Sequence, residues 1–211
     1  MVWSNPIKMP DSAPSSSKLI KPLLCWLAIN LAALGLGAAG VSLSAKPFTP
    51  PEAGSLAIVA VAQVAMAALL WPVLFESGWG AVGVIFTAAP FLQAGAFLSA
   101  TPANLFLTTI AVVYVWLLTL AVLPVMKSGS MYVTVARVCV ILWCFGGALC
   151  CYFRAEFSIG VRPLPLGPIV QILSALPSET ATSHFLFAGG WLVVAIIIRV
   201  LATKRSRTSA L

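Results

Sequence analysis

The sequence predicts an all-α integral membrane protein: a six-transmembrane-helix bundle with a short re-entrant or interfacial outer helix between spans five and six. Three observations predict this fold. The 211 residues are 61% hydrophobic and only 8% charged, whereas a soluble domain carries about a quarter charged residues. The apolar runs last about twenty residues, which is the length of helix that crosses the hydrocarbon core of a bilayer. They do not alternate with polar residues, as the strands of a membrane barrel would.

Each run is expected to be a helix, because hydrocarbon offers no hydrogen-bond partner to an open backbone. Breaks rich in Pro, Gly and Ser separate the runs and mark the turns. The predicted membrane domain covers residues 22–203, with spans at 22–44, 54–75, 79–98, 104–126, 131–153 and 184–203.

The Pro/Ser-rich residues 1–21 are too short to fold alone and predict a disordered cytoplasmic tail. Residues 204–211 predict a second, basic cytoplasmic tail. The first apolar run is longer than the apolar region of a signal peptide, although "SLSA" near its end resembles a cleavage site. We favour a retained signal-anchor span over a cleaved signal peptide.

The distribution of basic residues predicts the orientation in the membrane. Twelve Lys and Arg exceed five Asp and Glu, for a formal charge of +7, and most of them lie at the ends of apolar runs. With the N-terminus inside, the cytoplasmic side carries Lys8, Lys18, Lys21, Lys127, Lys204, Arg205 and Arg207, and the outer side carries Lys46, Arg154 and Arg162. The positive-inside rule therefore places both termini in the cytoplasm. We expect a multi-pass protein of the plasma (inner) membrane that has the lipid bilayer as its surroundings and does not bind nucleic acid.

The long connection before the last span, "RAEFSIGVRPLPLGPIVQILSALPSE", is apolar and rich in proline. Pro163, Pro165 and Pro168 forbid a regular helix through its first half. The apolar "IVQILSAL" that follows is too short to span, so it predicts a helix that lies in the interface or re-enters the membrane. One interpretation is a connector that skims the lipid. The other is an outer lid that includes these prolines and Gln171.

Polar side chains inside spans are the first candidates for function, because hydrocarbon makes them costly. Asn30, Gln63 and Gln93 each fall well inside one of the first three spans. They could line a polar substrate pathway. Alternatively, each amide could form hydrogen bonds between helices and have only a structural role.

Two arginines also fall inside predicted spans. Arg137 and Arg199 can extend their charged heads to the cytoplasmic surface along their aliphatic stems. Alternatively, either arginine could pair with Glu76, an acidic residue in the inner "ESG" turn.

No motif for catalysis or for a cofactor is present. The five cysteines form no CxxC pair and His184 is the only histidine, so neither a metal site nor a haem site is expected. The sequence contains no Walker loop and carries no acidic residue inside the predicted spans. We expect a protein that is not an enzyme and that has no cofactor.

Two functions fit this sequence. The first is a transport component, a permease-like subunit that moves a small or lipophilic substrate and is energised by a separate partner, such as a cytoplasmic nucleotide-binding subunit. The second is a non-catalytic structural or assembly subunit of a larger membrane complex. Small residues such as Gly37 and the pairs in "CFGG" and "AGG" allow close helix approach. They favour a homo-oligomer or contact with other membrane subunits.

Overall fold

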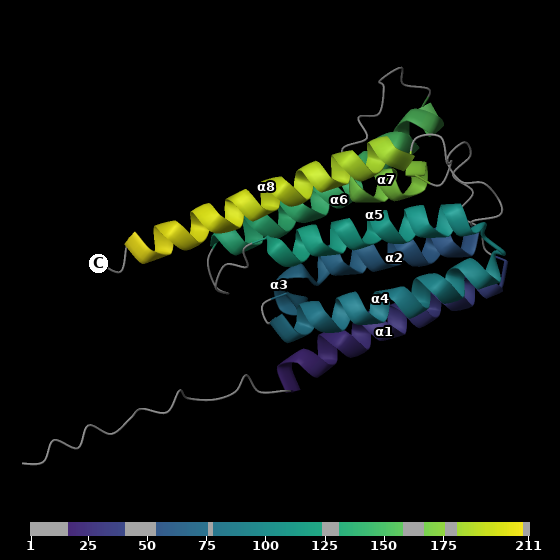
Figure 1. The fold of residues 1–211 in the computed structure, drawn as a ribbon, viewed down its shortest axis with the longest axis horizontal. Coiled ribbons are helices and arrows are strands. Elements are labelled where there is room, and N and C mark those ends of the chain that lie inside the picture. Colours follow the sequence, from purple (N-terminus) through teal and green to yellow (C-terminus); the bar gives the residue numbers. More distant parts are fainter. Residues whose placement is uncertain are drawn as a thin grey trace, which may run out of the picture.

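A computed structural model describes residues 17–40, 54–75, 78–123, 131–157, 167–175 and 181–208 of the chain. These residues form eight helices and no strand, which confirms the all-helical prediction. The long helices lie side by side, and successive ones run in opposite directions (Figure 1). The helices are α1 (Ser17–Ala38), α2 (Gly54–Leu69), α3 (Trp71–Leu74), α4 (Gly78–Leu98), α5 (Ala103–Val122), α6 (Met131–Phe157), α7 (Pro168–Ala175) and α8 (Ala181–Thr208).

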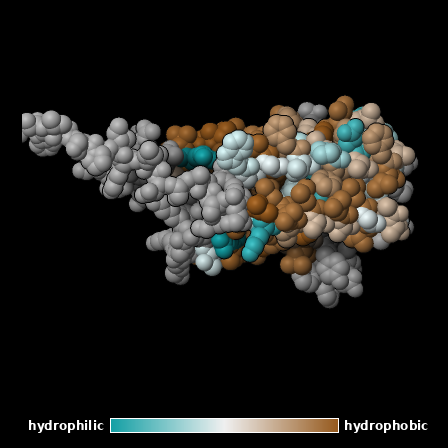
Figure 2. All heavy atoms as spheres, turned by 90° about the horizontal axis from the view of Figure 1, so that it is seen from below, coloured by the Kyte–Doolittle hydropathy of each residue, from teal (hydrophilic) through white to brown (hydrophobic). Residues whose placement is uncertain are grey.

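Among the described residues, four helices are long and apolar enough to cross a membrane, over Ile20–Ala38, Trp79–Leu98, Ala103–Val122 and Phe185–Ala202. Two further apolar helical stretches, Gly54–Leu69 and Thr134–Cys150, are shorter. Large apolar side chains are widely exposed on the outside of the bundle, and the surface in Figure 2 is predominantly hydrophobic. Water would penalise such a surface, whereas lipid chains would not. The chain is therefore a membrane protein with several spans.

The helices extend beyond the predicted spans at both ends of the chain. Helix α1 begins at Ser17, five residues before the predicted start, and α8 continues to Thr208, so parts of both predicted tails are helical. The apolar composition marks only the part of a helix that lies in hydrocarbon. Lysine and arginine are good helix formers, so the helix continues into the polar flanks.

The predicted second span is divided near Pro72. Helix α2 ends at Leu69 and α3 begins at Trp71, with Leu70 between them at φ −94° and ψ 7°. Proline is tolerated in the first turn of a helix because the missing N–H has no partner there, so Pro72 fits α3 better than the interior of a continuous helix. The interruption explains why α2 alone is shorter than a full span.

Helix α2 lies at the centre of the bundle and packs against α1, α4, α5, α6 and α7. Twelve of its sixteen residues are buried, as expected for a helix that is apolar on every side. Close approach to α1 depends on Gly37, where an added Cβ would lie 2.8 Å from Ser55 Oγ and 3.2 Å from Ser55 Cα. Gly95 of α4 approaches the backbone of Leu56 in the same way. Small residues thus set the distances between α2 and its neighbours.

The short helix α7 confirms that a helix follows Pro168. It packs against α2, α5, α6 and α8 at one end of the bundle (Figure 1), and Ile169, Val170 and Ile172 are buried there. An added Cβ at Gly167 would lie 2.8 Å from the carbonyl oxygen of Trp143, and one at Gly147 would lie 3.1 Å from Val170 Cγ2. Glycines therefore allow α7 to dock closely on α6.

We predict that Gly37→Ala destabilises the fold by about 1–3 kcal/mol, because the new methyl group overpacks the contact with Ser55. Gly35→Ala is the matched control in the same helix, since nothing lies within 4 Å of its added Cβ. Thermal unfolding of both variants in detergent measures the difference. Equal stability of the two variants would contradict the close α1–α2 contact.

Candidate functional site

The predicted amides Asn30 and Gln63 lie in the interior between α1, α2 and α4. Both side chains are fully buried. Asn30 Nδ2 donates to the carbonyl of Trp26 in its own helix at 2.8 Å, and Gln63 Nε2 donates to the carbonyl of Ala88 at 3.0 Å. The oxygen atoms of both amides have no hydrogen-bond donor among the described residues. The Gln63 amide therefore joins α2 to α4, which is the structural role that the sequence allowed.

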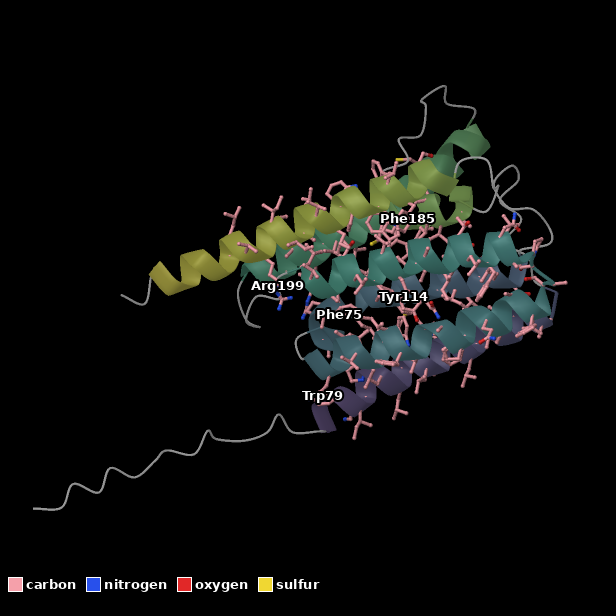
Figure 3. All side chains as sticks on the ribbon, viewed as in Figure 1. Phe75, Trp79, Tyr114, Phe185 and Arg199 are labelled. Carbon is pink, nitrogen blue, oxygen red and sulfur yellow. The ribbon has the colours of Figure 1, made fainter. Side chains whose placement is uncertain are left out.

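Helix α4 receives hydrogen bonds from three neighbouring helices within one stretch. Besides Gln63, the Trp26 indole of α1 donates to Thr87 Oγ1 at 3.0 Å. The Tyr114 hydroxyl of α5 donates to the carbonyl of Ile85 at 2.9 Å, and Figure 3 shows Tyr114 between these two helices. These three hydrogen bonds fix the position of α4 along its axis relative to α1, α2 and α5.

The third amide, Gln93, does not join the other two. Its side chain is exposed on the outer face of α4. Seven residues, or about two helical turns, separate it from the exposed Phe86, so both point away from the bundle. The three amides consequently do not form a common polar seam in the interior.

A second polar arrangement closes the C-terminus of α5. In a helix the carbonyl of Leu120 would accept from the N–H of residue 124, but residue 124 is proline and has no N–H. The Trp71 indole of α3 donates to this carbonyl instead, at 2.8 Å. The proline leaves an acceptor that hydrocarbon could not satisfy, and the tryptophan satisfies it.

Arg199 donates to two further carbonyls at this end of α5. Its Nη1 lies 3.2 Å from the carbonyl oxygen of Ala121 and 3.4 Å from that of Val122, and Figure 3 shows the side chain reaching from α8 to the end of α5. A cation at a helix C-terminus also interacts favourably with the helix dipole. Arg137 is exposed on α6. Glu76 lies outside the described residues, so its pairing with either arginine stays a prediction.

The predicted lid residues are only partly described. Pro168 is the first residue of α7, as a helix start allows, and both it and Gln171 are buried. Pro163 and Pro165 lie outside the described residues. Where it is described, the segment packs into the bundle and not along its surface.

An apolar pocket of about 190 Å³ lies between α5, α6 and α8. Apolar cavities of about 150 Å³ already hold a molecule such as benzene. The pocket therefore has room for one small ring or for part of a lipid chain. Its lining residues are Thr119, Leu123, Cys139, Val140, Trp143, Trp191, Val194, Ala195 and Ile198.

Three tryptophans join the helices that surround this pocket. The ring centroids of Trp116 and Trp143 are 5.0 Å apart in an edge-to-face arrangement, and those of Trp143 and Trp191 are 4.9 Å apart. The indole nitrogens of Trp116 and Trp143 are buried without a hydrogen-bond acceptor among the described residues. Ring contacts thus hold the walls of the pocket, at separations typical of stabilising aromatic pairs.

Comparison of the chain with protein-family models, with curated proteins and with solved structures finds no match in any of the three.

The contacts of the buried tryptophans were not predicted from the sequence. Trp71 had a detectable signal, because Pro124 leaves Leu120 without a donor and a tryptophan at a predicted span end can supply one. The pocket gave no detectable signal in the sequence, because its lining residues come from three helices and are of types common in any membrane span.

We predict that Trp71→Phe destabilises the protein by about 1–3 kcal/mol, because the carbonyl of Leu120 becomes a buried acceptor without a donor. Trp79→Phe is the control, since it makes the same replacement of indole by phenyl at a side chain that is 77% exposed. Detergent-based thermal unfolding compares the two. If the Trp71 variant unfolds at the same temperature as the wild type, the indole is not the donor that stabilises the end of α5.

Proposed function

We propose that the protein is a membrane-embedded transport component that takes a lipophilic substrate from the bilayer into the pocket between α5, α6 and α8. The observation that carries this proposal is the pocket itself. The walls of the pocket are apolar, and the pocket is open to the outside of the bundle. The helices that form it also carry exposed apolar side chains on their outer surfaces. A substrate dissolved in hydrocarbon could enter such a site without passing through water.

The position of Arg199 favours an amphiphile with an anionic head group. Arg199 follows the lining residue Ile198 directly, and it donates to the carbonyl of Val122, which precedes the lining residue Leu123. Arginine carries five N–H donors in a planar group that suits phosphate and carboxylate. An apolar chain in the pocket would place such a head group near the guanidinium.

The proposed transport unit crosses the membrane six times, with α2 and α3 together forming the second crossing and α6 the fifth. Both termini are cytoplasmic in this arrangement. The excess of basic residues at the predicted inner side supports it. So does the position of the start of α1 and the end of α8 at one end of the bundle (Figure 1). Helix α7 would then be a re-entrant element that closes the outer end.

Energy would come from a separate partner, because the sequence contains no Walker loop. A cytoplasmic nucleotide-binding subunit fits the proposed orientation. The second candidate, a non-catalytic assembly subunit, is favoured by one observation of its own: the exposed aromatic residues on the outer face of α4.

A pair of neighbouring valines in α8 tests the transport proposal. Val194 lines the pocket, whereas Val193 does not line it and is 55% exposed. Val194→Phe should fill the pocket, and Val193→Phe adds the same ring outside it. Purified variants in liposomes are assayed for transbilayer movement of a fluorescent, anionic lysophospholipid.

We expect wild type and Val193→Phe to accelerate this movement, and Val194→Phe to reduce the acceleration several-fold. Photolabelling with a diazirine-bearing lysophospholipid shows whether the loss reflects binding. Equal movement and labelling in the two variants would contradict the pocket as the substrate site. If wild type moves no lipid and stoichiometric membrane proteins copurify with it, the assembly function replaces transport.

A further inference from the structure

The outer face of α4 carries a stripe of exposed residues along the whole helix. Trp79, Phe86 and Phe97 are 77%, 76% and 77% exposed. Eighteen residues, or five helical turns, separate Trp79 from Phe97, so these rings lie on one face. The other exposed residues of this stripe are Val82, Pro90 and Gln93.

Gln93 is the polar exception in this stripe. No described residue forms a hydrogen bond with its amide, although the side chain lies within the apolar window Trp79–Leu98. The Cα–Cβ bonds of a helix tilt toward its N-terminus. Gln93 lies closer to the C-terminal end of the apolar window, at Leu98, than to its N-terminal end. The side chain is therefore directed into the bilayer and away from the nearer surface.

An amide in this position needs a hydrogen-bond partner from outside the protomer, because lipid chains offer none. A primary amide is self-complementary, since it contains both a donor and an acceptor. Copies of one chain insert in the same orientation, so a two-fold axis between them must lie along the membrane normal. Such an axis would bring Gln93 of each copy to the same depth.

We propose that the outer face of α4 is the interface of a symmetric homodimer, in which the Gln93 amides of two copies hydrogen-bond to each other. The rings of Trp79, Phe86 and Phe97 lie on both sides of this amide pair. Each ring packs against the same residue of the second copy. This inference does not depend on the transport proposal, because the pocket lies between α5, α6 and α8 and shares no lining residue with α4.

Cysteine crosslinking tests which face meets the second copy. The five native cysteines are first replaced by serine or alanine. The thermal unfolding temperature of the resulting chain must equal that of the wild type. Single cysteines then replace Gln93 on α4 or Leu107 on α5. Leu107 is a matched control, because it is 62% exposed and lies near the same end of the bundle as Gln93.

In liposomes, oxidation should give a covalent dimer with Gln93→Cys and little or none with Leu107→Cys. Equal crosslinking at the two positions would overturn the proposal. So would a Gln93→Cys adduct that, in native membranes, contains a different protein in place of a second copy.

Substitution of the amide tests its contribution to the dimer. Gln93→Leu should weaken dimerisation about tenfold, as expected for the loss of a pair of interhelical hydrogen bonds. Gln93→Asn keeps an amide and should retain most of the affinity. Energy transfer between labelled copies, measured as the protein is diluted in lipid, gives the dissociation constants. Unchanged dimerisation of Gln93→Leu, or a wild type that stays monomeric, would refute the amide pair.

The monomer fold should be insensitive to these substitutions, because Gln93 contacts none of the other helices through a hydrogen bond in the described structure. Thermal unfolding of Gln93→Leu under dilute, monomeric conditions checks this. A large loss of monomer stability would mean that Gln93 acts within the protomer, and it would count against the dimer.

Discussion

Hydrocarbon cannot donate a hydrogen bond to a backbone carbonyl, and this constraint shapes the interior of the bundle. Regular helices satisfy most carbonyls internally, but a proline removes one donor. At the end of α5, Pro124 cannot serve Leu120, and the indole of Trp71 does so. Arg199 and the backbone N–H of Leu123 serve the other carbonyls of the last turn. Three segments that are distant in the sequence, α3, α5 and α8, are thereby held at one end of the bundle.

The same constraint explains the distribution of polar side chains around α4. Trp26, Gln63 and Tyr114 each donate to an acceptor of α4 from a different helix. These bonds act together with the close contacts at Gly37 and Gly95, which draw α1 and α4 onto the central α2. Helices α1 and α4 lie on one side of α2 and α5, and α6 and α8 lie on the other (Figure 1). The two proposed functional surfaces, the pocket and the α4 stripe, are consequently on different sides of the molecule.

Much of the fold could be predicted from the sequence, because the length of an apolar run reports directly on the thickness of hydrocarbon. The short helix after Pro168 was also predictable, since proline can begin a helix and the apolar stretch is brief. The division of the second span was harder to predict, because a proline inside a membrane helix can bend it or end it. Which amides point into the bundle and which point outward was not predicted. Gln63 and Gln93 look equivalent in sequence, and only the packing of α2 and α4 buries one and exposes the other.

The exposed apolar faces of the bundle must lie in hydrocarbon, and spin labelling measures their surroundings directly. Single nitroxides replace Leu31 in α1, Leu142 in α6 and Ile197 in α8, which are 62%, 63% and 52% exposed, in a cysteine-free chain reconstituted in liposomes. We predict that dissolved oxygen, which concentrates in lipid, relaxes all three labels strongly, and that a water-soluble nickel chelate does not. Efficient relaxation by the nickel chelate at these positions would place the faces in water and contradict the central claim.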